Sequence, residues 1–176
     1  SSTGTTLLDP YLQVWWNYVV QFCPMWLAPN LITIIGMIGF MIPSLLLAYY
    51  LPTGSLDYYY EDSNLLTTTS KIITYLLFLN ATTVFIYQTL DAIDGKQARR
   101  TGSASPLGEL FDHGMDSITT VWMANSFLIC LNYGLEPEIF LIFAWSIHST
   151  FYLTHWITYL TGTLEFQFLD CTEFHL

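Results

Sequence analysis

Positive charge is nearly missing from this sequence. Only four of its 176 residues are lysine or arginine, and the formal net charge is −10. A protein that binds nucleic acid through a basic face needs clustered lysines and arginines, because these side chains neutralise the phosphates. The scarcity of basic residues therefore argues against nucleic acid as a partner.

Cysteines are also few, and charges of both signs are sparse. The three cysteines, Cys23, Cys130 and Cys171, lie far apart, which fits neither a disulfide framework nor the close ligand pairs of a zinc site. Charged residues make up 10% of the chain and hydrophobic residues 53%, whereas soluble domains carry about 25% charged residues. This composition indicates a membrane protein.

What the sequence has in abundance is long apolar runs, each long enough, or nearly so, to cross a hydrocarbon core of about 30 Å as a helix. An aromatic stretch of mixed polarity precedes the first run. It is typical of a helix lying in the membrane interface, with a stretch of no fixed structure as the alternative. Asn30 is expected to cap the helix of the first run. We therefore predict a single all-α membrane domain over residues 1–176, a polytopic helix bundle with an interfacial amphipathic helix at residues 11–27 and four transmembrane helices at residues 31–51, 72–90, 110–133 and 139–160.

The few basic residues are unevenly placed. Lys96, Arg99 and Arg100 follow the second apolar run, where a short loop rich in turn-forming residues begins. Basic residues are enriched in the cytoplasmic loops of membrane proteins. This loop, the N-terminus and the C-terminus are therefore predicted to face the cytosol.

Four aspartates flank this loop. On a helix, Asp91 and Asp94 share one face, and Asp112 and Asp116, four residues apart, share a face of the next helix. The short loop makes these helices antiparallel neighbours, so we expect the two faces to meet at the cytosolic edge of the membrane. The same faces carry three small residues that leave space for a bulky ligand: Gly95, Ala98 and Gly108.

Converging carboxylates repel one another unless cations lie between them. Their oxygens are hard ligands that suit Mg²⁺ or Mn²⁺ and not zinc. Two such ions would balance four negative charges, and two-metal sites support in-line attack at phosphorus. Arg99 supplies a planar guanidinium suited to phosphate. A pathway for cations through the membrane is the alternative interpretation.

Residues 91–116 match a long signature, D-x2-D-G-x2-A-R-x8-G-x3-D-x3-D, at each of its eight fixed positions. So many fixed positions make the match far more specific than an ordinary short motif. The pattern resembles that of the CDP-alcohol phosphotransferase family. Residues 29–33, 88–90, 111–114 and 155–159 are similar to the eukaryotic choline/ethanolamine phosphotransferases in particular, so the resemblance extends over most of the chain.

The resemblance implies an activity and its ligands. A phospho-alcohol would pass from CDP-choline or CDP-ethanolamine to the hydroxyl of diacylglycerol, releasing CMP and forming phosphatidylcholine or phosphatidylethanolamine. The implied ligands of two Mg²⁺ or Mn²⁺ ions are Asp91, Asp94, Asp112 and Asp116. The residues implied in donor binding are Asn30, Gly95, Ala98, Arg99, Gly108 and Glu109.

The resemblance also implies an integral membrane protein of the endoplasmic reticulum or Golgi whose active site faces the cytosol. It leaves open a homodimer formed through the helices, and it does not separate choline from ethanolamine.

The residue that accepts the hydroxyl proton has two candidates. Family resemblance points to the last signature aspartate, Asp116. A carboxylate bound to two cations is a poor base, however, whereas a neutral imidazole titrates near physiological pH. We therefore expect His113 to be the base, oriented by Glu109 one helical turn earlier, with Asp116 as a metal ligand.

The number of spans departs from the family pattern. Four are predicted here, against a family core of six or more. Besides an active transferase, the sequence therefore leaves a second interpretation, a catalytically inactive truncated isoform that acts as a membrane partner of the full-length enzyme. A transporter or channel for cations is the third.

Overall fold

The computed structural model describes residues 8–55 and 66–161 of the chain. Within these residues the protein is all-α, as predicted, and contains no strand. Cys171 and both chain ends lie outside the described residues. The elements are α1 (Asp9–Val19), the 3-10 turn η1 (Val20–Phe22), α2 (Pro29–Tyr50), α4 (Leu66–Thr101), α5 (Pro106–Cys130) and α6 (Pro137–Thr161).

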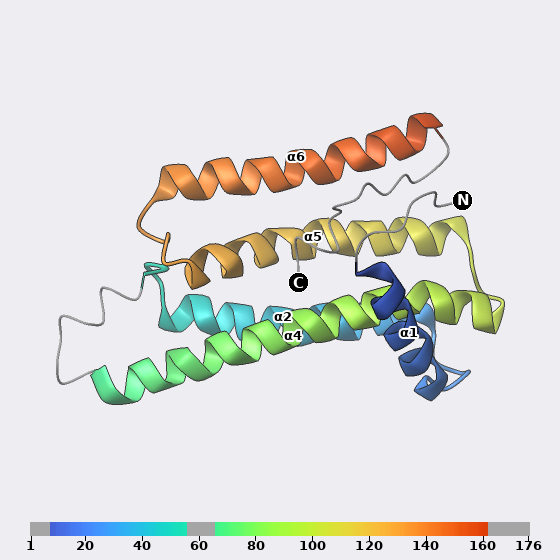
Figure 1. Ribbon diagram of the computed structural model, residues 1–176, viewed down its shortest axis with the longest axis horizontal. Coiled ribbons are helices and arrows are strands. Elements are labelled where there is room, and N and C mark those ends of the chain that lie inside the picture. The colour runs from blue at the N-terminus through green and yellow to red at the C-terminus, as the bar shows by residue number, and fades with distance from the viewer. Residues whose placement is uncertain (1–7, 56–65, 162–176) are drawn as a thin grey trace.

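Four long helices run along the length of the molecule, and α1 crosses one end of the bundle (Figure 1). The antiparallel helices α2 and α4 form the most extensive contact. Helix α5 packs against both of them, and α6 packs against α5. The end crossed by α1 gathers the start of α2, the end of α4 and the start of α5 (Figure 1).

Two of these helices are long and apolar enough to cross a membrane, judged by length and composition: Pro29–Tyr50 and Thr69–Thr101. Large apolar side chains such as Ile35, Ile38 and Phe78 are exposed on them, as expected of a surface that faces lipid. At 1.5 Å per residue, α4 is about 54 Å long and exceeds a hydrocarbon core of about 30 Å. Its ends therefore reach beyond the core. Whether α5 and α6 also span the membrane stays a prediction.

The starts of α2 and α5 follow from their first residues. Pro29 stands in the first turn of α2, and Ala28 occupies the N-cap position without a side-chain hydrogen bond. The expectation that Asn30 caps this helix is therefore wrong, because Pro29 takes the first helical position and the cap lies two residues earlier, at Ala28. In α5 the cap is regular, since Ser105 precedes Pro106 and its hydroxyl accepts a hydrogen bond from the Gly108 N–H (3.1 Å).

A glycine turn joins α4 to α5. Gly102 has a φ of +68°. This is a left-handed conformation that is unfavourable for residues with a β-carbon. The Ser103 N–H donates to the Ala98 carbonyl (2.9 Å), and the Gly102 N–H donates to the Arg99 carbonyl (3.4 Å). These bonds satisfy carbonyls at the end of α4 and reverse the chain. The two halves of the signature therefore lie on adjacent antiparallel helices.

The N-terminal segment is only partly helical. The predicted interfacial helix at residues 11–27 appears as α1 and η1, which end at Phe22 and are followed by turns. Tyr11, Tyr18, Phe22 and Trp26 are exposed, an aromatic surface of the kind found at membrane interfaces. The buried Trp16 instead packs with Val20, Ile32 and Ile93, joining this segment to α2 and α4.

Polar bonds from the end of α4 also hold the N-terminal segment. The Lys96 ammonium donates to the side-chain oxygens of Gln13 (2.7 Å) and Asn17 (2.9 Å) on α1. The side chain of Gln97 is fully buried and donates to the Pro24 carbonyl (2.8 Å). The signature-bearing end of α4 is therefore fixed against α1 and the turn that follows it.

Candidate metal centre

Three carboxylates meet where α4 faces α5. Asp91 on α4 and Asp112 and Asp116 on α5 each contribute one oxygen to a group in which all three oxygens lie within 4.8 Å of one another. Residues 91 and 112 come together because the Gly102 turn folds α5 back along α4. Asp112 and Asp116 are one helical turn apart, so both point to the same side.

Asp94 lies beside this group and is held from a third helix. It is buried, and its Oδ2 accepts a hydrogen bond from the hydroxyl of Thr33 on α2. Its carboxyl also interacts directly with that of Asp112. The structure thus places all four predicted aspartates together, three as a compact group and Asp94 at its edge.

Asp116 is oriented by a hydroxyl chain. The Tyr87 hydroxyl on α4 donates to Asp116 Oδ1 (2.7 Å) and accepts a hydrogen bond from the Thr119 hydroxyl (2.9 Å). Tyr87 is only 3% exposed and Thr119 only 1%. This network fixes one oxygen of Asp116.

Two carboxylate oxygens in the cluster have no hydrogen-bond partner. Asp91 Oδ1 and Asp112 Oδ1 are both buried and unpartnered. A buried carboxylate oxygen without a donor is costly, and a bound cation removes that cost. Closely spaced oxygen donors with unsatisfied lone pairs fit Mg²⁺ or Mn²⁺, which prefer carboxylate ligands.

Most of the nearby positive charge is directed away from the carboxylates. The Arg100 guanidinium donates to the carbonyls of Val20 (2.6 Å), the first residue of η1, and Cys23 (3.0 Å), which follows η1, while Lys96 binds α1. Arg99 differs, because its exposed side chain folds back over α4 and makes no such bond to the described part of the N-terminal segment. Its Nη1 lies 3.6 Å from the position that a β-carbon on Gly95 would take. Of these three cations, Arg99 is the one positioned beside a signature glycine.

The other predicted donor-binding residues lie at the same end of the bundle. A β-carbon on Gly108 would be 3.7 Å from Asn30 Oδ1, so the start of α2 faces the start of α5. Ala98 is half-buried on α4, and Glu109 is exposed in the first turn of α5. The absence of side chains at Gly95 and Gly108 leaves room beside Arg99 and Asn30.

His113 has a different neighbour from the one expected. Its half-buried ring packs edge-to-face against the ring of His155 on α6, with the ring centroids 4.6 Å apart. No hydrogen bond joins His113 to Glu109 in the described part of the chain. The pairing of His113 with Glu109 and its role as base therefore stay predictions.

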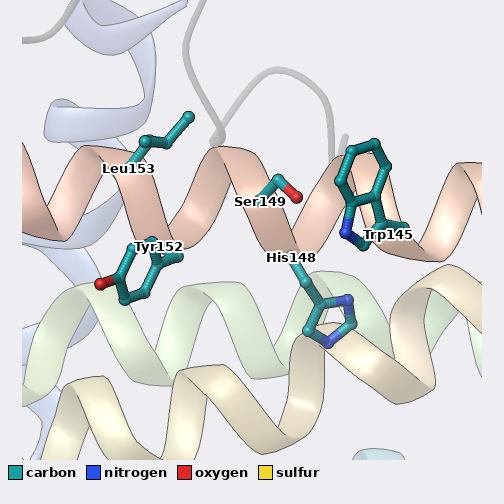
Figure 2. Close-up of a pocket in the computed structure, with 5 residues that line it drawn as sticks. All are labelled: Trp145, His148, Ser149, Tyr152 and Leu153. Carbon is teal, nitrogen blue, oxygen red and sulfur yellow. The ribbon is translucent and has the colours of Figure 1, made fainter.

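A shallow hollow elsewhere on the molecule contains none of these carboxylates. Figure 2 shows its lining, which comes from a single helix, α6: Trp145, His148, Ser149, Tyr152 and Leu153. A hollow lined by one helix and almost wholly apolar offers no converging polar groups. The converging polar groups lie instead at the junction of α2, α4 and α5.

Comparison with known proteins decides the family. The sequence model described as CDP-alcohol phosphatidyltransferase matches residues 26–164, which include every aspartate of the cluster. The chain belongs to the CDP-alcohol phosphatidyltransferase family.

Relatives within this family include several vertebrate proteins named cholinephosphotransferase 1. The chain is 44% identical over 176 residues to that of Homo sapiens, covering 100% of this chain and 40% of the relative. It is 42% identical over 173 residues to those of Danio rerio and Gallus gallus, covering 98% of this chain and 42% and 48% of those relatives. The chain thus spans less than half the length of these curated relatives.

Three residues that contact the candidate site residues were not assigned a role from the sequence, namely Thr33, Thr119 and His155. Thr119 follows Asp116 by three residues, a spacing that places it on the same side of α5. Thr33 and His155 come from α2 and α6, and no spacing within the signature reports which residue of another helix will face it. Only the packing of the helices reveals these two contacts.

Proposed function

We propose that this chain carries the active site of a metal-dependent phosphotransferase of the CDP-alcohol phosphatidyltransferase family. The reaction is transfer of phosphocholine, or phosphoethanolamine, from a CDP-alcohol to the hydroxyl of diacylglycerol. The observation that carries the proposal is the group formed by Asp91, Asp112 and Asp116 within a family domain. Choline is the first headgroup to test, because the vertebrate relatives are named cholinephosphotransferases.

Asp91, Asp94, Asp112 and Asp116 are the proposed ligands of two Mg²⁺ or Mn²⁺ ions. When bound, such ions neutralise the carboxylates and stabilise negative charge on the attacking and leaving oxygens of a phosphoryl transfer. Two features of the protein support this assignment: the unpartnered oxygens of Asp91 and Asp112 and the hydrogen bonds that fix Asp94 and Asp116.

The donor nucleotide is proposed to lie over the small residues next to the carboxylates. Gly95, Ala98 and Gly108 leave the space, and Arg99 supplies a fork-shaped donor for the phosphates. Asn30 and Glu109, at the starts of α2 and α5, would bind the polar parts of the donor. Arg99 and Asn30 are exposed at this end of the bundle, so both are accessible to a ligand from solution.

In the proposed step the diacylglycerol hydroxyl oxygen attacks the β-phosphorus of the donor. A new bond forms between that oxygen and phosphorus, and the bond from phosphorus to the bridging oxygen breaks. CMP leaves with the electron pair. The hydroxyl proton passes to a ring nitrogen of His113, which Glu109 assists. Asp116 is held by Tyr87 and, as a metal ligand, is the weaker base.

The proposed setting is a membrane of the endoplasmic reticulum or Golgi with the carboxylate end of the bundle facing the cytosol. CDP-alcohols are soluble and highly charged, so they reach the site from the aqueous side. Diacylglycerol is apolar and would enter from the bilayer between the helices. A homodimer formed through the helices is compatible with this arrangement.

The decisive experiment measures CMP release by the purified chain in lipid nanodiscs containing diacylglycerol. CDP-choline and CDP-ethanolamine are supplied in turn, with and without Mg²⁺ or Mn²⁺. Asp112→Asn should abolish metal-dependent release because it removes a charged ligand, whereas Glu138→Gln, which changes an exposed acid in the first turn of α6, should not. Absence of release with retained donor binding would support the alternative of an inactive membrane partner instead.

His113→Ala tests the base separately. We expect CMP release to fall by about 100-fold or more, as for loss of a general base, while binding of CDP-choline and of Mn²⁺ stays close to that of the unsubstituted chain. Isothermal titration of the donor and electron paramagnetic resonance of Mn²⁺ measure the two affinities. Loss of either affinity in this variant would contradict the assignment of His113 as the base.

A further inference from the structure

His155 brings a second imidazole to the proposed active site from a helix outside the signature. Its ring meets that of His113 at an interplanar angle of 81°, with the ring centroids 4.6 Å apart. Edge-to-face packing at this distance is a favourable aromatic geometry, because the positive edge of one ring meets the negative face of the other. The contact crosses from α6 to α5, and it is the ring contact that the structure gives for His113.

The His155 ring is itself held in place on α6. Its Nδ1 lies 2.9 Å from the Phe151 carbonyl oxygen, and a carbonyl only accepts hydrogen bonds, so Nδ1 carries the proton. The ring also packs on that of Phe151, with the centroids 4.2 Å apart. Both contacts restrict rotation of the His155 side chain. It can therefore act as a fixed surface for His113.

We propose that His155 is a positioning residue that holds the His113 imidazole in one orientation beside the carboxylate cluster. The inference rests on the proposed function only in taking His113 as the base. An imidazole on a helix can rotate away from the cluster, and a small displacement of a reacting group lowers a rate steeply. The ring of His155 closes the side of His113 that faces α6. It acts through its shape and not through a bond to substrate.

A matched set of variants separates ring packing from the other properties of His155. His155→Phe keeps an aromatic ring and removes both nitrogens, whereas His155→Asn keeps a polar group and removes the ring. His155→Ala removes both. The control is His148→Ala, because His148 lies two turns earlier on α6 and makes the same bond to a backbone carbonyl, that of Ala144 (2.7 Å). His148 lines the separate hollow of Figure 2.

The first readout is the rate of CMP release. His155→Ala and His155→Asn should lower kcat by about threefold to tenfold, the range expected for loss of an aromatic pair, with the KM for CDP-choline changed less than about twofold. His155→Phe should retain most of the kcat of the unsubstituted chain, and His148→Ala should have no effect on kcat. An equal loss of kcat in His155→Phe and His155→Ala would overturn the proposal. A similar loss of kcat in His148→Ala would also overturn it.

The second readout does not need activity. The chain has four histidines, so ¹³C labelling of the histidine rings gives a simple NMR spectrum in nanodiscs. The ring current of His155 should shift the His113 signal, and the shift should disappear in His155→Ala and persist in His155→Phe. A His113 chemical shift that is unchanged in all three His155 variants would refute the positioning role. If the unsubstituted chain releases no CMP, the proposed function fails while this spectrum still decides the contact.

Discussion

The carboxylates of the cluster are chemically alike, but their neighbours divide them into two pairs. Asp94 and Asp116 each accept a hydrogen bond from a buried hydroxyl, that of Thr33 or Tyr87. Asp91 and Asp112 each leave a buried oxygen unpartnered. In metal sites, hydrogen bonds to the ligating carboxylates fix their orientation and support the affinity for the ion. The site therefore depends on Thr33 and Tyr87 as well as on the signature itself.

Tyr87→Phe tests this dependence at one atom. The substitution removes the hydroxyl that binds Asp116 and Thr119 but keeps the ring that packs beside Phe40 and Met123. We expect affinity for Mn²⁺ to fall by about tenfold or more, as is usual when a hydrogen bond to a metal ligand is lost. Titration of Mn²⁺ followed by electron paramagnetic resonance measures this. Tyr18→Phe, an exposed tyrosine on α1, is the control, and an unchanged affinity in Tyr87→Phe would contradict the role of the hydroxyl.

At the scale of elements, the turn between α4 and α5 decides whether the two halves of the signature meet. Gly102 supplies the left-handed residue of this turn. The turn also places Ser105 where it caps α5. A chain that reversed even one residue later would rotate Asp112 by about 100° relative to Asp91, because each helical residue turns by that angle.

A pair of glycine substitutions isolates this conformational requirement. A β-carbon meets nothing within 4 Å at either Gly102 or Gly39, but only Gly102 has a positive φ. Gly102→Ala should therefore lower the free energy of unfolding by about 1 kcal/mol through backbone strain alone. Gly39→Ala, inside α2, should raise it by about 0.5–1 kcal/mol. Reversible unfolding in detergent followed by circular dichroism compares the two, and equal effects would show that φ is not what distinguishes them.

The sequence predicts helices well and their ends less well, for a physical reason. Hydropathy marks only the part of α4 that suits lipid, so the prediction of residues 72–90 misses the polar turns at both ends, and the helix is Leu66–Thr101. A helix can extend beyond the apolar part of the membrane, because its backbone hydrogen bonds form in water as well as in lipid. The second half of the signature shows the same effect, since α5 begins at Pro106 and not at residue 110, where the predicted span begins.

The grouping of the aspartates could be predicted because it needs only helical spacing and a short reversal. The contacts of Thr33 and His155 could not be, since they depend on how α2 and α6 rotate about their axes when they pack. Lys96 is a third case. Its charge suggests a contact with a phosphate group or with the membrane surface. In the structure, however, Lys96 donates to the side chains of Gln13 and Asn17. A charge in a sequence does not reveal its partner.

At the scale of the whole molecule, the bundle has two different ends. One end joins α1, the carboxylates and the turn at Gly102. At the other end, the turn after α2 packs against the turn between α5 and α6, where a β-carbon on Gly134 would lie 2.1 Å from the backbone of Gly54. The close approach of backbones lies at one end, and the proposed binding site lies at the other, the end with α1.

The predicted orientation can be tested with single cysteines placed at the two ends. In a chain whose native cysteines are replaced by alanine, Ala104→Cys in the turn before α5 should react with a membrane-impermeant maleimide from the cytosolic side of sealed microsomes. Leu135→Cys, exposed in the turn between α5 and α6, should react only after the membrane is opened. The reverse pattern would overturn the cytosolic placement of the site.

The end of α4 has one further consequence. The signature leaves the two positions between Gly95 and Ala98 unspecified. In this chain they are Lys96 and Gln97, whose side chains donate hydrogen bonds to α1 and to the segment after it. One stretch of helix thus presents Asp91 and Asp94 on one side and its attachment to the N-terminal segment on the other. A displacement of α1 would therefore reach Asp91 and Asp94 through one continuous helix.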